Sequence, residues 1–313
     1  MRLQLTTGGI ALANAESRLS MSESPGGAFR ELIRAGTLVL PGAHNALSAR
    51  LAESVGFQGV YVSGAGVTNA LTAMPDVALL TLTEMAQQCR YICDAVSVPC
   101  IADGDTGYGE TLNVARAVRD LEGAGLAGIH IEDQVSPKRC GHLDGKQVIP
   151  PKEMARRIAA AARARRNPEF FLIARTDARA VNGLDDALDR AMLYLDAGAD
   201  AIFPEALESE EEFAEFGRRV KAPLLANMTE FGKSPLLSVN ELSALGYGMV
   251  IYPMTQLRVM IKAAESALLE LKQNGSQRGF VDQMQTRAEL YDLIRYGEYS
   301  TFDQEVARSF PEA

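Results

Sequence analysis

Cysteine and long apolar runs are scarce in this 313-residue chain, and each absence excludes a class of protein. The four cysteines, Cys89, Cys93, Cys100 and Cys140, show neither Cys-x-x-Cys spacing nor a small secreted framework, so disulfides are not expected. No apolar run approaches the about 20 residues needed to cross a bilayer, and the N-terminus lacks a secretory pattern. We therefore expect a cytoplasmic protein that has reduced thiols and no membrane partner.

Basic residues are also outnumbered, with 31 lysines and arginines against 40 acidic residues and a formal net charge of -9. A nucleic-acid partner needs a concentrated basic face, so this balance argues against one. An anionic small molecule remains compatible with it if arginines converge locally. Cys89 and Cys93 are four apart on a predicted helix, but no ligand cluster accompanies them, and we interpret them as core thiols.

Short apolar runs bounded by turn residues predict eight β-strands, at Leu38–Leu40, Gly59–Ser63, Pro99–Asp103, Gly128–Asp133, Phe170–Arg175, Ala201–Glu205, Pro223–Asn227 and Met249–Tyr252. Apolar residues at helical spacing follow each of them and predict helices at 45–56, 83–96, 111–124, 152–166, 184–197, 208–219, 238–245 and 254–273. A further helix is expected before the first strand, at Ala28–Ala35.

Eight strand–helix units in alternation predict an α/β fold, a (β/α)8 TIM-type barrel with additional C-terminal helices. We assign residues 25–275 to this catalytic barrel and residues 1–24 to a poorly ordered N-terminal tail. Residues 276–313 form a C-terminal helical extension. Its apolar Leu290, Leu293 and Ile294 suit packing on a neighbouring subunit.

Polar residues gather where the predicted strands end. In a barrel of this type the chemistry lies at the carboxyl ends of the strands, so these residues should converge on one mouth. They are Ser63-Gly64-Ala65-Gly66, Asp103-Gly104-Asp105, His130-Ile131-Glu132-Asp133, Arg175-Thr176-Asp177, Glu205 and Asn227-Met228-Thr229-Glu230.

A carboxylate cluster within this set predicts a metal site. Asp103 and Asp105 are two apart, so on an extended strand end both face one side, and Glu132 offers a third oxygen from the adjacent strand. Hard oxygen donors favour Mg2+, with Mn2+ as the alternative, over zinc. The competing interpretation is a solvated acidic rim.

A thiol follows the fourth strand in the segment Lys138-Arg139-Cys140-Gly141-His142. Flanking cations should make Cys140 lose its proton more easily than a free thiol, and Gly141 allows a tight turn or a close approach to a ligand. The segment lies in a loop that ends near Pro150-Pro151, which is typical of an active-site lid. An incidental surface loop is the alternative.

Three further side chains complete the predicted chemistry. His130 could be a ligand, a proton carrier or a hydrogen-bonded interior histidine, and these alternatives stay open. Arg175 and Arg258 would present forked donors to carboxylates, although either could form a surface salt bridge. A metal ion, arginines and a tunable thiol together predict a carbon–carbon lyase that acts on a small polycarboxylate through a carbanion-like intermediate.

Over residues 25–308 the motifs resemble the isocitrate lyase and phosphoenolpyruvate mutase superfamily, and within it most closely the methylisocitrate lyase family. The segments that carry the resemblance are Tyr61-Val-Ser-Gly-Ala-Gly66, Pro75-Asp76, Asp103-Gly-Asp-Thr-Gly-Tyr-Gly109, His130-Ile-Glu-Asp-Gln134, Lys138-Arg-Cys-Gly-His142, Ala174-Arg-Thr-Asp177, Phe203-Pro-Glu-Ala206, Ala226-Asn-Met-Thr-Glu-Phe-Gly232, Tyr252-Pro253 and Met284-Gln-Thr-Arg-Ala-Glu-Leu-Tyr291.

This resemblance implies Mg2+-dependent cleavage of 2-methylisocitrate to pyruvate and succinate, in propionate catabolism, by a homotetramer. It implies metal carboxylates at Asp103 and Asp105, with Asp76 and Glu132 reaching metal-bound waters. Cys140 is implied as the acid and Tyr61 as a candidate base. The implied substrate shell is Ser63, Gly64, Ala65, Cys140, Gly141, Arg175, Glu205, Asn227, Met228, Thr229, Arg258 and Arg287.

The chain departs from the family at Ala65, where methylisocitrate lyases often carry a third glycine. Related lyases for 2,3-dimethylmalate or isocitrate are the alternative, because a single methyl group changes discrimination by only about 1–3 kcal/mol. Phe203 and Pro253 are the hypothesised walls of a methyl pocket. A barrel that binds carboxylates without catalysis is a second alternative, since fold alone does not establish activity.

Overall fold

The computed structural model of the chain describes residues 24–139, 141–142 and 145–309. Its centre is a parallel sheet of eight strands, which are β1 (Leu38–Ala43), β2 (Val60–Val62), β3 (Cys100–Asp103), β4 (Gly128–Glu132), β5 (Phe171–Thr176), β6 (Ala201–Pro204), β7 (Leu225–Asn227) and β8 (Met249–Tyr252). The strand order is β6-β5-β4-β3-β2-β1-β8-β7, and a parallel bridge between Ile202 and Leu224 joins β6 to β7. The predicted eight-stranded barrel is confirmed.

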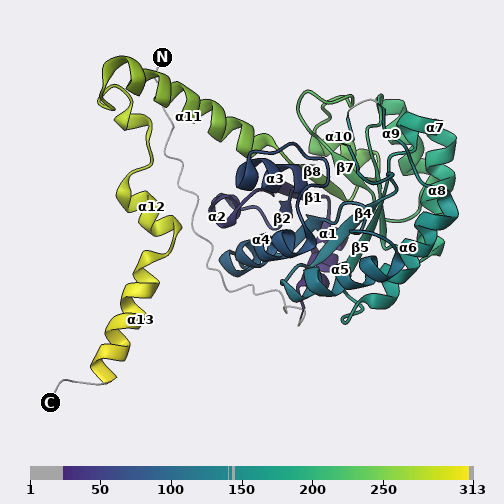
Figure 1. Cartoon of the computed structure of the whole chain (residues 1–313), viewed down its shortest axis with the longest axis horizontal. Coiled ribbons are helices and arrows are strands. Elements are labelled where there is room, and N and C mark those ends of the chain that lie inside the picture. The colour runs from purple at the N-terminus through teal and green to yellow at the C-terminus, as the bar shows by residue number, and fades with distance from the viewer. Residues whose placement is uncertain (1–23, 140, 143–144, 310–313) are drawn as a thin grey trace.

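Helices cover the outside of this sheet, as Figure 1 shows. The helix before the barrel is α1 (Pro25–Ala35), and those that follow successive strands are α2 (Ala46–Ser54), α4 (Leu82–Ala95), α5 (Thr111–Gly123), α6 (Pro151–Ala164), α8 (Leu184–Asp196), α9 (Glu210–Arg219), α10 (Val239–Ala244) and α11 (Thr255–Asn274). The helices expected between strands and after the last one agree with these bounds to within two residues.

Two helices were not predicted, α3 (Gly64–Thr72) and α7 (Arg179–Asn182). α3 begins with Gly-Ala-Gly, and glycine is a poor helix former, so local propensity conceals it. Its start is fixed instead by the side chain of Ser63, whose Oγ accepts a hydrogen bond from the Gly66 amide at 3.1 Å. The segment that follows β2 is therefore a capped helix, not a loop.

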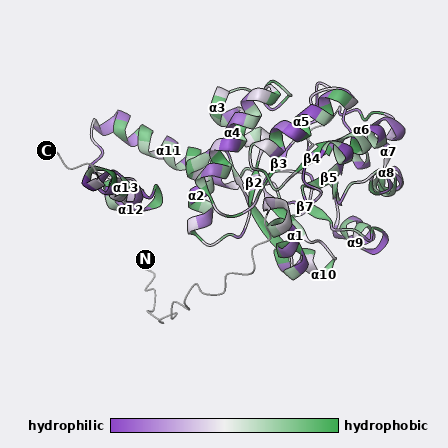
Figure 2. Ribbon diagram, turned by 90° about the horizontal axis from the view of Figure 1, so that it is seen from below, coloured by the Kyte–Doolittle hydropathy of each residue, from purple (hydrophilic) through white to green (hydrophobic). Residues whose placement is uncertain are grey.

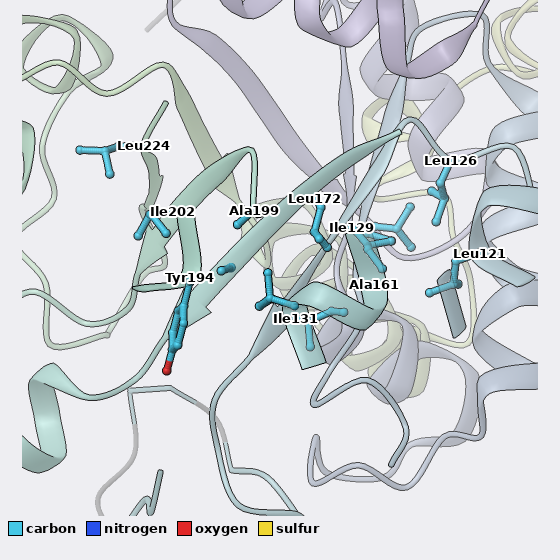
Figure 3. Close-up of a cluster of buried hydrophobic side chains, with 14 of the residues drawn as sticks. Leu121, Leu126, Ile129, Ile131, Ala161, Leu172, Tyr194, Ala199, Ile202 and Leu224 are labelled. Carbon is cyan, nitrogen blue, oxygen red and sulfur yellow. The ribbon is translucent and has the colours of Figure 1, made fainter. Parts of the chain in front are cut away.

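The core has two layers because side chains alternate along each strand. One layer fills the barrel and includes Leu40, Ile101, Ile173 and Ile251. The other lies between the strands and the helices. Figure 3 shows part of it, where strand residues such as Ile129, Ile131 and Leu172 face helix residues such as Leu121, Ala161 and Tyr194.

A buried polar network joins β4, β5 and α8. The carboxylate of Asp133 accepts hydrogen bonds from the Thr176 hydroxyl, the Tyr194 hydroxyl and the Asp177 amide, each at 2.8 Å. Arg190 Nη1 adds an ion pair at 3.2 Å. Burying a carboxylate is tolerated here because its oxygens are saturated by donors. The network fixes the end of β5.

The chain leaves the barrel through α11 and continues into a 3-10 turn (Val281–Gln283), α12 (Arg287–Leu293) and α13 (Tyr296–Ser309). We call residues 255–309 the C-terminal arm. Figure 1 shows it projecting from the barrel, and Figure 2 shows hydrophobic positions along α11. Leu257 is the buried residue of α11, whereas Val259 and Leu268 are each 64% exposed. No helix among the described residues is long and apolar enough to span a membrane.

Candidate active site

A cavity of about 320 Å³ opens at the carboxyl ends of the strands. It is lined by side chains from β2, β3, β5, β6, β7 and β8, so the convergence expected from the sequence is present. The predicted site residues that line it are Tyr61, Ser63, Ala65, Asp76, Asp103, Gly141, Arg175, Glu205, Asn227, Thr229 and Arg258.

Other predicted residues lie elsewhere. Met228 packs in the hydrophobic core and does not line the cavity, and Arg287 begins α12 in the C-terminal arm. Asp105 and Glu132 are buried and do not line the cavity themselves. Each forms an ion pair with a residue that does, Asp105 with Lys138 and Glu132 with Arg175. Cys140 lies outside the described residues, so its role stays a prediction.

A lysine of the loop between β4 and α6 sits among the predicted metal carboxylates. Nζ of Lys138 is 2.6 Å from Oδ1 of Asp76 and 2.9 Å from Oδ1 of Asp105. Lys138 was expected to act on the neighbouring thiol, and its contact with two acids from distant segments was not foreseen. The backbone amide of Asp105 also donates to Oδ1 of Asp103 at 2.9 Å, which orients the first carboxylate.

Burial and neighbouring charges push the pKa values of these acids in different directions. Burial raises the pKa of Asp105 to about 6, and the charges of Asp103 and Asp76 add to the rise while Lys138 opposes it. Burial alone would also raise the pKa of Asp103, but His130, Lys138 and Arg175 together hold it below its usual value. Burial keeps the pKa of Glu132 well above its usual range. The carboxylates are therefore not equivalent.

The donor set fits a hard divalent cation. Both carboxylate oxygens of Glu132 are buried without a hydrogen-bond donor, with Arg175 Nη1 3.4 Å from Oε2, and Oδ1 of Asp105 faces the ammonium of Lys138 at 2.9 Å. Such oxygens are costly to bury unless a cation or donor reaches them. No group of three histidine, cysteine or acidic side chains is already gathered as a metal site within the described part of the chain. The oxygen chemistry nevertheless matches Mg2+ or Mn2+.

Tyr61 and His130 form a buried pair beside Asp103. The Tyr61 hydroxyl oxygen is 2.8 Å from Nε2 of His130, and the two rings are stacked with centroids 5.8 Å apart. Burial lowers the pKa of His130 to about 4 even though Asp103 opposes the shift, so the imidazole is neutral at pH 7. Burial and the charge of Asp103 raise the pKa of Tyr61 well above its usual value, so the phenol keeps its proton.

Arg175 lies at the centre of an acidic wall. Its Nε donates to Oδ2 of Asp177 at 2.9 Å, and its Nη1 is 3.4 Å from Oε2 of Glu132. The guanidinium also lies over the ring of Phe203, 5.1 Å from the centroid. The Phe203 ring thus helps to hold the charged guanidinium in place by a cation–π contact. The arginine is thus preorganised, with its charge shared among several acids.

Glu205 connects the same wall to the loop. Its Oε1 is 2.8 Å from Nε2 of His142, and Asn227 Nδ2 donates to both of its oxygens at 3.3 Å. A Cβ on Gly141 would lie 2.5 Å from Nη2 of Arg175 and from Oε1 of Glu205. Glycine is therefore required here because the loop backbone passes directly against both side chains. The sequence predicted a tight turn or a close approach to a ligand at Gly141, and the structure shows a close approach to two side chains of the protein.

A second arginine reaches the cavity from the first turn of α11. Nη1 of Arg258 is 2.9 Å from a carboxylate oxygen of Glu230 and also donates to the Glu230 carbonyl at 2.6 Å. Arg139, Arg175 and Arg258, from three different elements, thus line one small cavity, which can bind an anion with more than one carboxylate.

Comparison with known sequences gives one consistent family. Residues 29–272 match the phosphoenolpyruvate phosphomutase family. The chain is 53% identical over 291 residues to a 2-methylisocitrate lyase of Aeropyrum pernix, covering 93% of this chain and 94% of that protein. It is 54% identical over 268 residues to a probable 2-methylisocitrate lyase of Corynebacterium glutamicum, covering 85% and 88%.

Solved structures agree in fold. Oxaloacetate acetylhydrolase bound to 3,3-difluorooxaloacetate superposes with a TM-score of 0.87 at 35% identity, covering 91% of this chain and 97% of that chain. A 2,3-dimethylmalate lyase gives 0.86 at 33% identity, with 91% and 96% covered. Phosphonopyruvate hydrolase in complex with oxalate and Mg2+ gives 0.81 at 30% identity, with 92% and 99% covered.

Replacing Gly64 by alanine should weaken binding of a divalent cation. A Cβ at this position would lie 2.6 Å from Oδ2 of Asp103, so the carboxylate must turn away. We expect the dissociation constant for Mn2+, followed by electron paramagnetic resonance, to rise about 10–100-fold. Gly36→Ala is the matched control, because its Cβ meets nothing within 4 Å. Equal Mn2+ affinity in Gly64→Ala and wild type would show that Asp103 is not a metal ligand.

Proposed function

Because the chain belongs to the phosphoenolpyruvate phosphomutase family, and within it to the 2-methylisocitrate lyases, we propose that it cleaves 2-methylisocitrate to pyruvate and succinate in the cytoplasm, in propionate catabolism. The chain is an enzyme, and the carbon–carbon lyase activity expected from its sequence agrees with these relatives. The proposal is carried by the convergence of arginines, including Arg175 and Arg258, and of the acids Asp76, Asp103 and Glu205 on one cavity.

The arginines bind the substrate's carboxylates. Arg175 and Arg258 line the cavity from β5 and α11 and carry the charge that a polycarboxylate needs. Hydroxyl and amide groups of Ser63, Asn227 and Thr229 line the same space and can orient the bound anion. Asp103, Asp105, Asp76 and Glu132 would hold Mg2+ or Mn2+ directly or through water. When bound there, the cation polarises the α-oxy-carboxylate of the substrate.

Cleavage needs one proton removed and one supplied. The substrate hydroxyl loses a proton, the carbon–carbon bond breaks to leave the pyruvate carbonyl, and the electron pair stays on the succinate-side carbon. Tyr61 is the candidate acceptor of the hydroxyl proton. Because its phenol is itself protonated, Tyr61 takes that proton only as it passes its own to Nε2 of the neutral His130, 2.8 Å away. Cys140 is proposed to protonate the succinate-side carbon.

Substrate choice would depend on the cavity wall. Phe203 and Pro253 line the cavity and are proposed to contact the methyl group of the substrate. One methyl group is worth only about 1–3 kcal/mol, so 2,3-dimethylmalate and isocitrate remain the alternative substrates. The similarity to a 2,3-dimethylmalate lyase structure supports 2,3-dimethylmalate as one of these alternatives.

The C-terminal arm is proposed to pack on a second copy of the chain within a homotetramer. A groove of about 1010 Å³ runs beside α11, and its lining includes exposed apolar Phe231, Val259, Leu268 and Leu269. An apolar surface of this kind marks a protein–protein contact when it is contiguous. Arg287 lies in this arm, so an assembly is also the route by which it could reach a site.

Charge placed in this groove should break the assembly. We expect Leu268→Glu with Leu269→Glu to convert a tetramer to smaller species in sedimentation equilibrium, because a carboxylate is costly to bury at an apolar contact. Ser266→Glu on the same helix, outside the groove lining, is the control and should keep the wild-type mass. If the wild-type protein sediments as a monomer, the proposed tetramer is wrong.

The reaction itself is tested by turnover with Mg2+. We expect pyruvate to appear from 2-methylisocitrate far faster than glyoxylate from isocitrate, and chelation by EDTA to abolish both. The keto-acid product, identified by mass spectrometry, distinguishes the candidate substrates. Preference for dimethylmalate or isocitrate would assign a different substrate to the same reaction type, and no cleavage of any of the three would refute the lyase proposal.

The same comparison of substrates on Phe203→Ala tests whether Phe203 contacts the methyl group of the substrate, an assignment that is wrong if the substrate preference does not change.

Replacing Cys140 by serine should retain substrate binding and lose most of the turnover. Serine preserves size and hydrogen bonding but is a far weaker acid, and loss of a positioned proton donor typically costs about 10^2–10^4 in rate. Binding is measured by calorimetry and turnover under saturating substrate. Cys100→Ser, which alters a buried thiol of β3, controls for general thiol loss. Near-normal turnover in Cys140→Ser would remove the thiol from the mechanism.

A further inference from the structure

One lysine of the loop between β4 and α6 is buried away from the cavity. Lys146 is only 8% exposed, and its Nζ lies 2.9 Å from Oδ1 of Asp177. The same ammonium donates to the backbone carbonyl of Gly141. An ammonium group is costly to bury unless it is paired and hydrogen-bonded, and here a carboxylate and a carbonyl satisfy it.

Asp177 is shared between this lysine and the substrate arginine. Its Oδ1 accepts from Lys146, while Arg175 donates to Oδ2 from Nε at 2.9 Å and to Oδ1 from Nη2 at 3.2 Å. One buried carboxylate therefore holds two cations from different elements, the loop and β5. Arg175 cannot shift without changing the electrostatic field at Lys146, and the reverse also holds.

The position of Asp177 is in turn fixed by hydrogen bonds to the buried carboxylate of Asp133. Its amide donates to Asp133 at 2.8 Å, and the neighbouring Thr176 hydroxyl donates to the same carboxylate. Asp133 is fixed in turn by Arg190 and Tyr194 of α8. The shared carboxylate thus stands on a rigid base, which is what a group that orients others requires.

The geometry separates these residues from the substrate. Gly141 and Arg175 line the cavity, but Lys146 and Asp177 do not. Among its described residues, the loop is joined to itself by an antiparallel bridge between Gln134 and Val148 and by two hydrogen bonds between the Gln134 side chain and the Arg139 backbone. Its ends are therefore fixed by backbone, whereas its position against Arg175 depends on side chains such as Lys146.

We propose that Lys146 and Asp177 form a positioning pair that sets the loop backbone at Gly141 and the guanidinium of Arg175 relative to each other. The pair acts through these two groups and does not touch the substrate. Its catalytic consequence rests on the proposed lyase function, but its structural consequence does not.

The test is Lys146→Met, which keeps most of the length and the apolar stem of the side chain and removes the charge. Lys152→Met is the matched control, because Lys152 is exposed at the start of α6 only six residues away. Hydrogen–deuterium exchange is followed in peptides covering residues 134–149 and, for comparison, in the peptides of β4 and β5. Steady-state kinetics with 2-methylisocitrate are measured on the same preparations.

We expect exchange in the loop of Lys146→Met to accelerate about tenfold or more, since hydrogen bonds to charged groups contribute about 1.5–3 kcal/mol. The strands should remain as protected as in wild type. The kcat/KM should fall by up to about 100-fold, because a small misplacement of binding groups is amplified in rate. Lys152→Met should change neither measurement.

A second variant guards against a general loss of stability. Asp177→Asn removes the shared charge, and adding Lys146→Met to it should then accelerate loop exchange less than Lys146→Met does alone. Full additivity of the two changes would overturn the pair. Unchanged loop exchange in folded Lys146→Met would also overturn it, as would uniformly faster exchange with normal kcat/KM. If wild type cleaves no substrate, the exchange measurements still decide the structural claim.

Discussion

The ionisable side chains at the carboxyl ends of β3 to β6 are almost completely buried, and this constraint governs the rest of the site. Charges out of water must be paired, so several acids there are matched to cations from other elements. Asp105 contacts Lys138, Glu132 contacts Arg175 and Asp177 contacts Lys146, and these ion pairs bring distant segments together. The wall that is proposed to bind an anion is thus also the place where the loop after β4 is fixed to the barrel.

Buried polar groups that lack a full set of partners are the ones that can take part in proton transfer or bind a cation. Glu132 has no hydrogen-bond donor on either carboxylate oxygen, and burial keeps its pKa well above the usual range. A neutral His130 and a protonated Tyr61 stand beside the acids for the same reason. Groups whose environments separate their protonation states can divide the roles of donor and acceptor between them. The barrel supplies this by holding all of them on short, rigid strands.

The sequence predicted the barrel well because alternation of strands and helices repeats eight times and each signal is local. It missed α3, whose Gly-Ala-Gly start is fixed by the Ser63 cap and by packing rather than by propensity. It found the acids at the strand ends but not the partner of Asp76 and Asp105, since Lys138 reaches them from a segment far along the chain. Met228 was placed with its polar neighbours, yet strand alternation turns its side chain into the core. No periodicity could have shown that Lys146 and Asp177 meet.

The barrel is joined between β6 and β7 by a single backbone bridge, from Ile202 to Leu224. At the mouth, the hydrogen bonds from Asn227 to Glu205 span the same seam, and His142 contacts Glu205 beside them. Closure of the cylinder is therefore shared between backbone and the side chains that face the cavity. A bound ligand that contacts both Glu205 and Asn227 would link the two sides of this seam, so occupancy of the cavity and mechanical stiffness of the whole barrel should rise together.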